Sequence, residues 1–175
     1  MFSLAYTPAY DPYHTFFRFL VLLTASEGQS LGYRSIRAAD FFFCFPWSLK
    51  DVRAPRDIEG FARKRNALLK KYPKSGYDNI PSSRLVFERM EMIQATAVSA
   101  LAGAGMIDAD SVASERLILN EERVPKQLKS SVRNASAKAP DLVEFLAVTL
   151  PKIDELGADG ILARTGLGEY TYDVV

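Results

Sequence analysis

The sequence predicts a mostly α-helical fold with a small β component, and three observations lead to that prediction. Apolar residues recur three or four positions apart over residues 82–108, as on one stripe of a helix. Several other segments show helical spacing or begin at a proline, which is typical of a first helical turn. One short β-prone run, 116–119, follows the 82–108 stretch.

The 82–108 stretch ends in a pattern that closes helices. Gly105 stands where a left-handed residue would end the helix, and Met106 would fold back onto Leu101 as in a Schellman ending. Such a helix, followed by a short strand, is typical of the last helix and wing of a winged helix-turn-helix. We therefore predict a winged helix-turn-helix-like core with its wing at 108–120. An ordinary amphipathic core helix with a glycine cap is the alternative.

The chain is expected to begin with an arm and a buried helix. Pro8 limits residues 2–10 to an edge strand or an extended arm. Asp11 as N-cap and Pro12 at the first helical position start a helix over 12–24. Aromatic and aliphatic side chains surround this helix almost completely, so we expect it to be buried on most sides.

A second helix is expected over 33–45, after a loop at 26–32, and Asp40 stands among its apolar residues. A buried carboxylate needs a partner, so we expect Asp40 to cap a helix or to pair with an arginine such as Arg37 or Arg18. A catalytic role is the weaker interpretation, because no second acid, histidine or metal ligand lies nearby in sequence.

Basic residues gather from residue 48 onward, although the net charge of the chain is only +1. We expect an amphipathic helix over 57–71 and a second basic helix over 124–137. Their cations either meet phosphates or an acidic partner, or form solvated helix faces. The candidate contacts for phosphates or an acidic partner are Arg63, Lys64, Arg65, Lys70, Lys71, Lys126, Lys129 and Arg133.

The remaining segments complete the expected architecture. The turn-rich segment 72–81 is expected to be an ordered loop with its two tyrosines tucked in. A helix is expected over 140–150, with a kink or restart at Pro151. Alternation at 170–174 suggests a terminal strand that pairs with the N-terminal arm. These are the added C-terminal helices and terminal arms of the predicted fold.

Length and composition fit one globular unit, with 175 residues, 48% hydrophobic and 25% charged. We divide it into a winged-helix-like core with its arm and basic helix at 1–120, and a helical extension with a terminal strand at 121–175. The longest strongly apolar run, 16–23, is too short to span a bilayer, and the start lacks a signal peptide pattern. A cytoplasmic location is therefore expected.

Residue types that catalysis needs are scarce. His14 is the only histidine and Cys44 the only cysteine, so the usual zinc ligand set cannot be assembled within one chain. We expect His14 to cap or pack and Cys44 to pack as a small apolar group. The glycines follow neither dinucleotide nor phosphate-loop spacing, and the carboxylates are scattered. We therefore expect no enzymatic activity, no metal and no cofactor.

Short segments spread over nearly the whole chain together resemble a known family. They are Pro8–His14 followed by Phe17 and Arg18, Arg37–Pro46, Leu85–Gln94, and Arg164–Leu167 followed by Tyr172 and Asp173. The chain resembles the small middle components of bacterial ABC-three-component conflict systems, a broad group to which the Lamassu-type anti-phage systems belong. The resemblance implies a non-catalytic adaptor encoded beside an SMC- or Rad50-like ABC ATPase and an effector such as a nuclease. It also implies that the protein contacts DNA only as part of the assembled complex.

An adaptor needs no active site and uses aromatic side chains as interface anchors. We expect neither a membrane nor a small-molecule substrate as its partner. Trp47 beside the basic segment is a candidate anchor, with a buried core tryptophan as the alternative. The candidate interface residues are Tyr10, Tyr13, Trp47, Tyr170 and Tyr172.

Two other functions remain open at this point. A winged-helix DNA-binding protein or transcriptional regulator would place residues 95–104 in the major groove. That helix offers Gln94, Thr96 and Ser99 but no arginine or lysine to reach guanine edges. It also ends in small residues at 103–106, where the family commonly has a bulkier, charged helix end. An effector with unrecognised chemistry would depend on Asp40 or His14.

Overall fold

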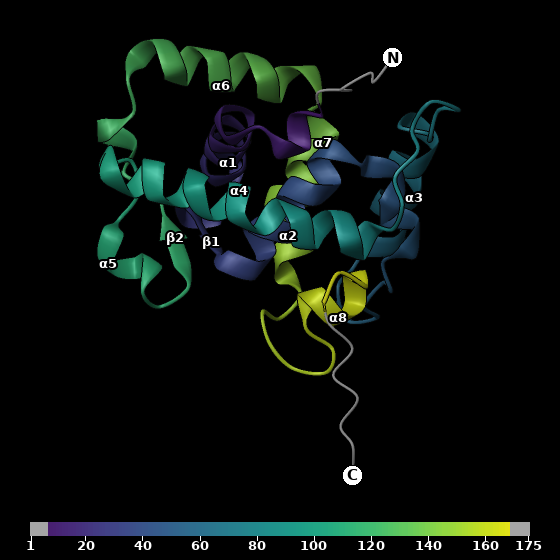
Figure 1. Cartoon of the computed structure of the whole chain (residues 1–175). Coiled ribbons are helices and arrows are strands. Elements are labelled where there is room, and N and C mark those ends of the chain that lie inside the picture. Colours follow the sequence, from purple (N-terminus) through teal and green to yellow (C-terminus); the bar gives the residue numbers. More distant parts are fainter. Residues whose placement is uncertain (1–6, 169–175) are drawn as a thin grey trace.

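The computed structural model describes residues 7–168 and is built mainly of helices, with one small two-stranded sheet beside α5, Ala109–Val112 (Figure 1). The prediction of a mostly α-helical fold with a small β component is confirmed. The start of the N-terminal arm, the terminal strand expected at 170–174, and the candidate residues Tyr170 and Tyr172 lie outside the described residues.

The first described elements are a short 3₁₀ helix, Pro8–Tyr10, and α1, Pro12–Ala25. The 3₁₀ helix corrects the expectation of an extended arm at these positions, because the peptide turns to begin α1. Asp11 caps α1 as predicted, and its Oδ1 accepts hydrogen bonds from the backbone N–H groups of Tyr13 (2.7 Å) and His14 (3.0 Å). From Thr15 on, most of α1 is buried, as its apolar composition predicts.

Further helices follow α1 along the chain. The predicted central helix is α4, Ser83–Gly103, which ends as expected. The Met106 N–H donates to Leu101 O at 2.9 Å, and Gly105 adopts a φ of 71°. The main helices after α1 are α2 (Tyr33–Cys44), α3 (Phe61–Lys71), α4 (Ser83–Gly103), α5 (Ala109–Val112), α6 (Lys126–Lys138), α7 (Pro140–Glu144) and α8 (Ile161–Thr165).

Two short strands form the sheet. In β1, Ser30–Gly32, Leu31 pairs with Leu117 of β2, Arg116–Ile118, in an antiparallel register. An isolated bridge between Ile107 and Leu119 extends the pairing. The expected β run at 116–119 is confirmed, whereas the loop expected at 26–32 is wrong in part because β1 lies within it. Strand β2, with which β1 pairs, is distant in the sequence, so no local pattern reveals the pairing.

Several features differ from the sequence-based expectation. The helix expected from residue 57 begins at α3, after Gly60, whose φ is 72°. The helix expected over 140–150 starts as α7, continues as a π-helical turn at Phe145–Thr149 and ends in a 3₁₀ turn at Leu150–Lys152. The sequence also gave no expectation of α5 or α8. Tyr77 is 99% exposed, so it is not tucked in, because the turn at 75–78 lies at the surface.

The hydrophobic core is one cluster with α1 at its centre. It joins apolar side chains of α1, α2 and α4 to those of the 140–153 segment, and Phe61 of α3 packs its ring 5.2 Å from that of Phe145. Helix α6 lies across α1 at one side of the molecule (Figure 1). None of the described helices combines the length and the apolar character needed to cross a membrane.

Candidate functional site

A buried polar cluster ties α1, α2 and α4 together. Asp40 of α2 has no exposed surface. Its Oδ1 accepts a hydrogen bond from Arg18 Nε at 2.6 Å, and its Oδ2 accepts one from Gln94 Nε2 at 2.9 Å. The prediction that Asp40 pairs with an arginine is therefore confirmed, with Arg18 of α1 as the partner. Gln94, expected among the polar side chains that α4 offers to DNA, is instead fully buried and bonded to Asp40, which corrects that expectation.

The same cluster extends to Arg37 through Gln94. Arg37 Nε donates to Gln94 Oε1 at 2.8 Å, and the guanidinium lies over the Phe87 ring, 4.4 Å from its centroid. Burial raises the pKa of the Asp40 carboxyl, and the nearby Arg18 guanidinium opposes that shift. Because both carboxylate oxygens are already bonded and no part of Asp40 is exposed, the cluster joins three helices and offers no surface to a substrate.

The two other candidate reactive groups are His14 and Cys44. The His14 side chain is 55% exposed, and its Nδ1 lies 3.5 Å from Asp11 Oδ2. Cys44 is half-buried at the end of α2, and burial raises the pKa of its thiol to about 12. This thiol stays protonated at neutral pH, as expected of a small apolar packing group. Within residues 7–168, no group of three or more histidine, cysteine, aspartate or glutamate residues is placed to hold a metal ion.

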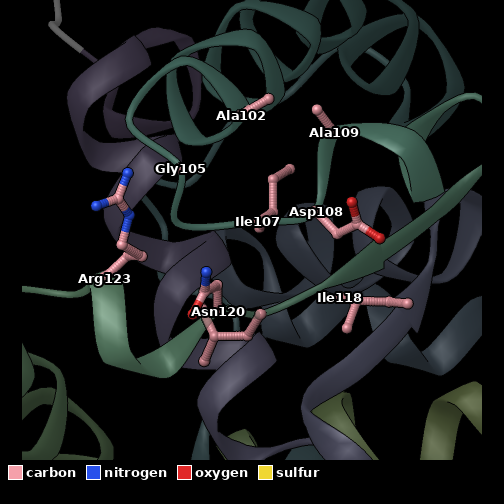
Figure 2. A pocket seen from close by; sticks show the side chains of 9 residues that line it. Ala102, Gly105, Ile107, Asp108, Ala109, Ile118, Asn120 and Arg123 are labelled. Carbon is pink, nitrogen blue, oxygen red and sulfur yellow. The ribbon is translucent and has the colours of Figure 1, made fainter.

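A hollow of about 490 Å³ lies between the end of α4 and the segment that carries β2 (Figure 2). The Arg123 side chain lies over Gly105, where an added Cβ would approach Nε at 3.2 Å. Asp108 lies across the hollow from Arg123, and its Oδ1 accepts the Asp110 N–H at 3.1 Å. Asn120 and apolar side chains complete the lining. The hollow thus presents one guanidinium, one amide and one helix-capping carboxylate, without a pair of convergent acids.

Two of the candidate cations on α3 lie opposite acids of α7. Lys64 Nζ lies 3.0 Å from Glu144 Oε1, and Lys71 Nζ lies 2.8 Å from Asp141 Oδ2. Arg65 Nη1 donates to the Val52 carbonyl at 2.6 Å. Of the candidate α3 cations, Arg63 and Lys70 are the exposed ones for which no ion pair is found among the described residues.

The candidate cations on α6 lie in a different environment. Lys126 and Arg133 are exposed and Lys129 is half-buried. Helix α6 contains neither aspartate nor glutamate, and within the described chain none of these three cations forms an ion pair. The sequence predicted two similar basic helices, whereas in the structure two of the α3 cations pair with acids and none of the α6 cations does so among the described residues.

The candidate aromatic anchors differ in how far they are exposed. Tyr13 is 86% exposed and Tyr10 is 37% exposed, so both are available to a partner. Trp47 is half-buried against the core, with its ring edge-on to Phe45 at 5.7 Å. This placement favours the alternative of a core tryptophan.

Glu155 is a structural contact that sequence reasoning missed. Its carboxylate accepts the backbone N–H groups of Arg34 and Ser35 at the start of α2, each at 3.0 Å, and it also accepts the Ser35 hydroxyl. A Cβ at Gly32 would collide with this carboxylate. The one signal of this contact in the sequence is a glycine, Gly32, directly before α2. A glycine there does not indicate that Glu155 is the acid that approaches it.

Comparison with known proteins gives one result that spans the chain. The model of a family described as ABC-three component (ABC-3C) system Middle Component 5 matches residues 4–173. No curated protein and no solved structure matches the chain.

Proposed function

The chain belongs to the ABC-three component system Middle Component 5 family, and from that premise we propose that it is a non-catalytic adaptor. In this proposal it joins an SMC- or Rad50-like ABC ATPase to an effector such as a nuclease, in a Lamassu-like antiviral complex in the cytoplasm. The observation that carries the proposal is the family match over residues 4–173. Membership as a middle component implies partnership with the other components of the system.

The interior of the molecule supports a binding role over a catalytic one. The most buried acid, Asp40, is held by Arg18 and Gln94 and is closed to solvent. The exposed Tyr13 borders an apolar hollow between α1 and α4 that is suited to contact with another protein. A subunit whose polar interior holds helices together, while aromatic groups face outward, fits the work of an adaptor.

The order of elements supports a winged-helix-like core. Helix α1 and strand β1 are followed by α2, the inserted α3, and α4; the Ile107 bridge, α5 and β2 then return the chain to the sheet. The exposed positions between 91 and 100 of α4 carry Glu91, Met92, Thr96, Ser99 and Ala100. None of these side chains supplies the guanidinium or ammonium group that reads guanine. The core is therefore better suited to protein contact than to reading DNA sequence.

Co-expression with the neighbouring components tests the proposal. The full chain should co-purify in defined stoichiometry with a coiled-coil ABC ATPase encoded beside it, and addition of the effector should give a larger complex. Failure to bind either component, or turnover of a substrate by the isolated chain, would contradict the adaptor function.

A DNA-binding assay separates the adaptor from the winged-helix regulator. The isolated chain should bind duplex DNA weakly, without sequence preference. Tight binding of one sequence by the chain alone, with a steep dependence on salt, would favour the regulator instead.

A further inference from the structure

A groove runs along α1 between the 3₁₀ helix at Pro8–Tyr10 and α6. It consists of two adjoining hollows, of about 370 Å³ and 480 Å³, that share Phe17, Arg18 and Phe43. The first hollow reaches Cys44 of α2. The second reaches the face of α6 that carries Ser131, Asn134, Ala135 and Lys138. We call this surface the α1–α6 groove.

The floor of the α1–α6 groove is apolar. Phe17, Phe43 and Cys44 are only half-buried, although they pack against the core. Because burial keeps the Cys44 thiol neutral at ordinary pH, this part of the floor carries no charge. A partner that covered these rings would remove apolar surface from water.

The charge of the groove has one sign. Neither aspartate nor glutamate lines either hollow. Arg18 is balanced by Asp40 beneath it, so the net positive charge comes from the exposed Lys138 at the rim. Elsewhere on α6, outside the lining of the groove, Lys126, Lys129 and Arg133 add positive charge, and the helix carries no acid. A segment entering the groove therefore meets an apolar floor with an exposed lysine at its rim.

We propose that the α1–α6 groove binds an acidic partner segment that carries large apolar side chains, such as an amphipathic helix rich in glutamate. The proposal rests on the adaptor function and names the surface through which it is exercised. Apolar residues of the segment would lie on Phe17 and Phe43, and its carboxylates would face Lys138. Charge complementarity would orient the segment and speed its association, while the rings would hold it.

A pair of synthetic helical peptides tests the groove on the full chain. One peptide presents leucine and phenylalanine on one face and glutamate elsewhere, and the matched peptide replaces every glutamate by lysine. Fluorescence anisotropy should give the acidic peptide an affinity at least about tenfold higher than that of the lysine peptide, with the difference shrinking as salt is added. Equal affinities, or no binding of the acidic peptide, would overturn the proposal.

Variants of α6 locate the binding. Asn134→Glu and Lys138→Glu each place a carboxylate on the groove wall and should weaken binding of the acidic peptide about tenfold. Lys126→Glu makes a charge change on the same helix outside the groove and should leave the affinity within about twofold. Circular dichroism confirms that the three variants fold alike. An equal effect of all three changes would mean that only the general charge of the molecule is felt.

Hydroxyl-radical footprinting provides a readout independent of charge. Bound acidic peptide should protect Phe17, Phe43 and Cys44 from oxidation. Protection confined to α3, or to Tyr13 and Met92, would place the partner elsewhere and overturn the proposal. If the ATPase complex forms while the groove binds no peptide and gains no protection in that complex, the adaptor function stands and this inference fails.

Residues 1–6 precede the groove in the sequence and are the competing occupant. A chain that begins at Thr7 should bind the acidic peptide with unchanged affinity. An affinity raised more than about tenfold by this deletion would show that the chain's own first residues take the place assigned here to a partner.

Discussion

The two basic helices, α3 and α6, resemble each other in sequence but differ in their surroundings. Lys64 and Lys71 of α3 lie opposite Glu144 and Asp141, so the acids of α7 offset part of the charge of α3. Helix α6 has no acid of its own, and none of its cations forms an ion pair with a described residue. A count of lysines and arginines gives the charge of a helix, but its neighbours decide how much of that charge a partner can meet.

The same two helices are attached differently. Helix α3 buries Phe61 and Leu68, whereas α6 buries Val132 and leaves Leu128 and Ala135 partly covered. The two helices therefore differ both in how much apolar surface they bury and in how much of their charge is paired. The more deeply anchored helix is the more neutralised one, and the helix with free charge rests on a smaller apolar contact.

The largest expected contrast is in stability. Phe61→Ala should lower the free energy of unfolding by about 3–5 kcal/mol, because it leaves a cavity beside Phe145. Val132→Ala should cost about 1–2 kcal/mol, because fewer buried atoms are removed. Urea denaturation of both variants measures the difference. Equal costs would mean that α6 is anchored as firmly as α3.

A smaller contrast is expected in binding of the acidic peptide. Lys138→Ala removes an exposed charge beside the groove and should weaken binding about threefold. Lys71→Ala removes a charge already offset by Asp141 and should change the affinity little. Anisotropy titrations at two salt concentrations measure both effects. A larger loss from Lys71→Ala would reverse the assignment of the available charge to α6.

The ion pair that links α3 to the 140–153 segment should make a modest contribution. A double-mutant cycle with Lys64→Ala and Glu144→Ala should give a coupling of about 0.5 kcal/mol, since both side chains are over one third exposed. Lys64 Nζ also donates to Thr149 Oγ1 at 3.3 Å, so Thr149→Val serves as the control for that second contact. A coupling near zero would show that proximity alone does not stabilise the contact.

The smallest expected effect is on the pH dependence of stability. Burial acts to raise the pKa of Asp141, but hydrogen bonds led by that from Lys71 lower it below the ordinary value of 3.8. The ionised carboxylate therefore stabilises the fold above pH 3.8, and this contribution is lost as the pH falls through the lowered pKa. Denaturation of Asp141→Asn and the native chain should differ slightly at pH 6 and converge at low pH. A difference that grows in acid contradicts the stated sign.

Local sequence patterns predicted much of the helical framework. The capping carboxylate of Asp11, the Schellman ending at Gly105 and Met106, and the run that became β2 each depend on residues a few positions apart. Such features are governed by backbone conformation and nearby hydrogen bonds, which neighbouring residues largely determine. The need of Asp40 for an arginine could likewise be foreseen, because a buried carboxylate requires a partner.

The α1–α6 groove could not be foreseen in this way. Its floor and wall come from Phe17, Phe43 and Lys138, which lie on three helices far apart in the sequence. The spacing within each helix indicates which side chains share a face, but not which face another helix leaves uncovered. The Glu155 contact with the start of α2 was missed for the same reason.

By itself, the sequence determined that this chain is mainly helical, where its central helix ends, and which acid must find a cation. Only the tertiary structure decided that Arg18 and Gln94 hold Asp40, that β1 pairs with β2, and that α3 and α6 differ in available charge. The physical reason is the distance along the sequence over which each kind of interaction acts. Helix formation and capping act over a few residues, whereas pairing, burial and charge compensation depend on segments that meet only when the chain folds.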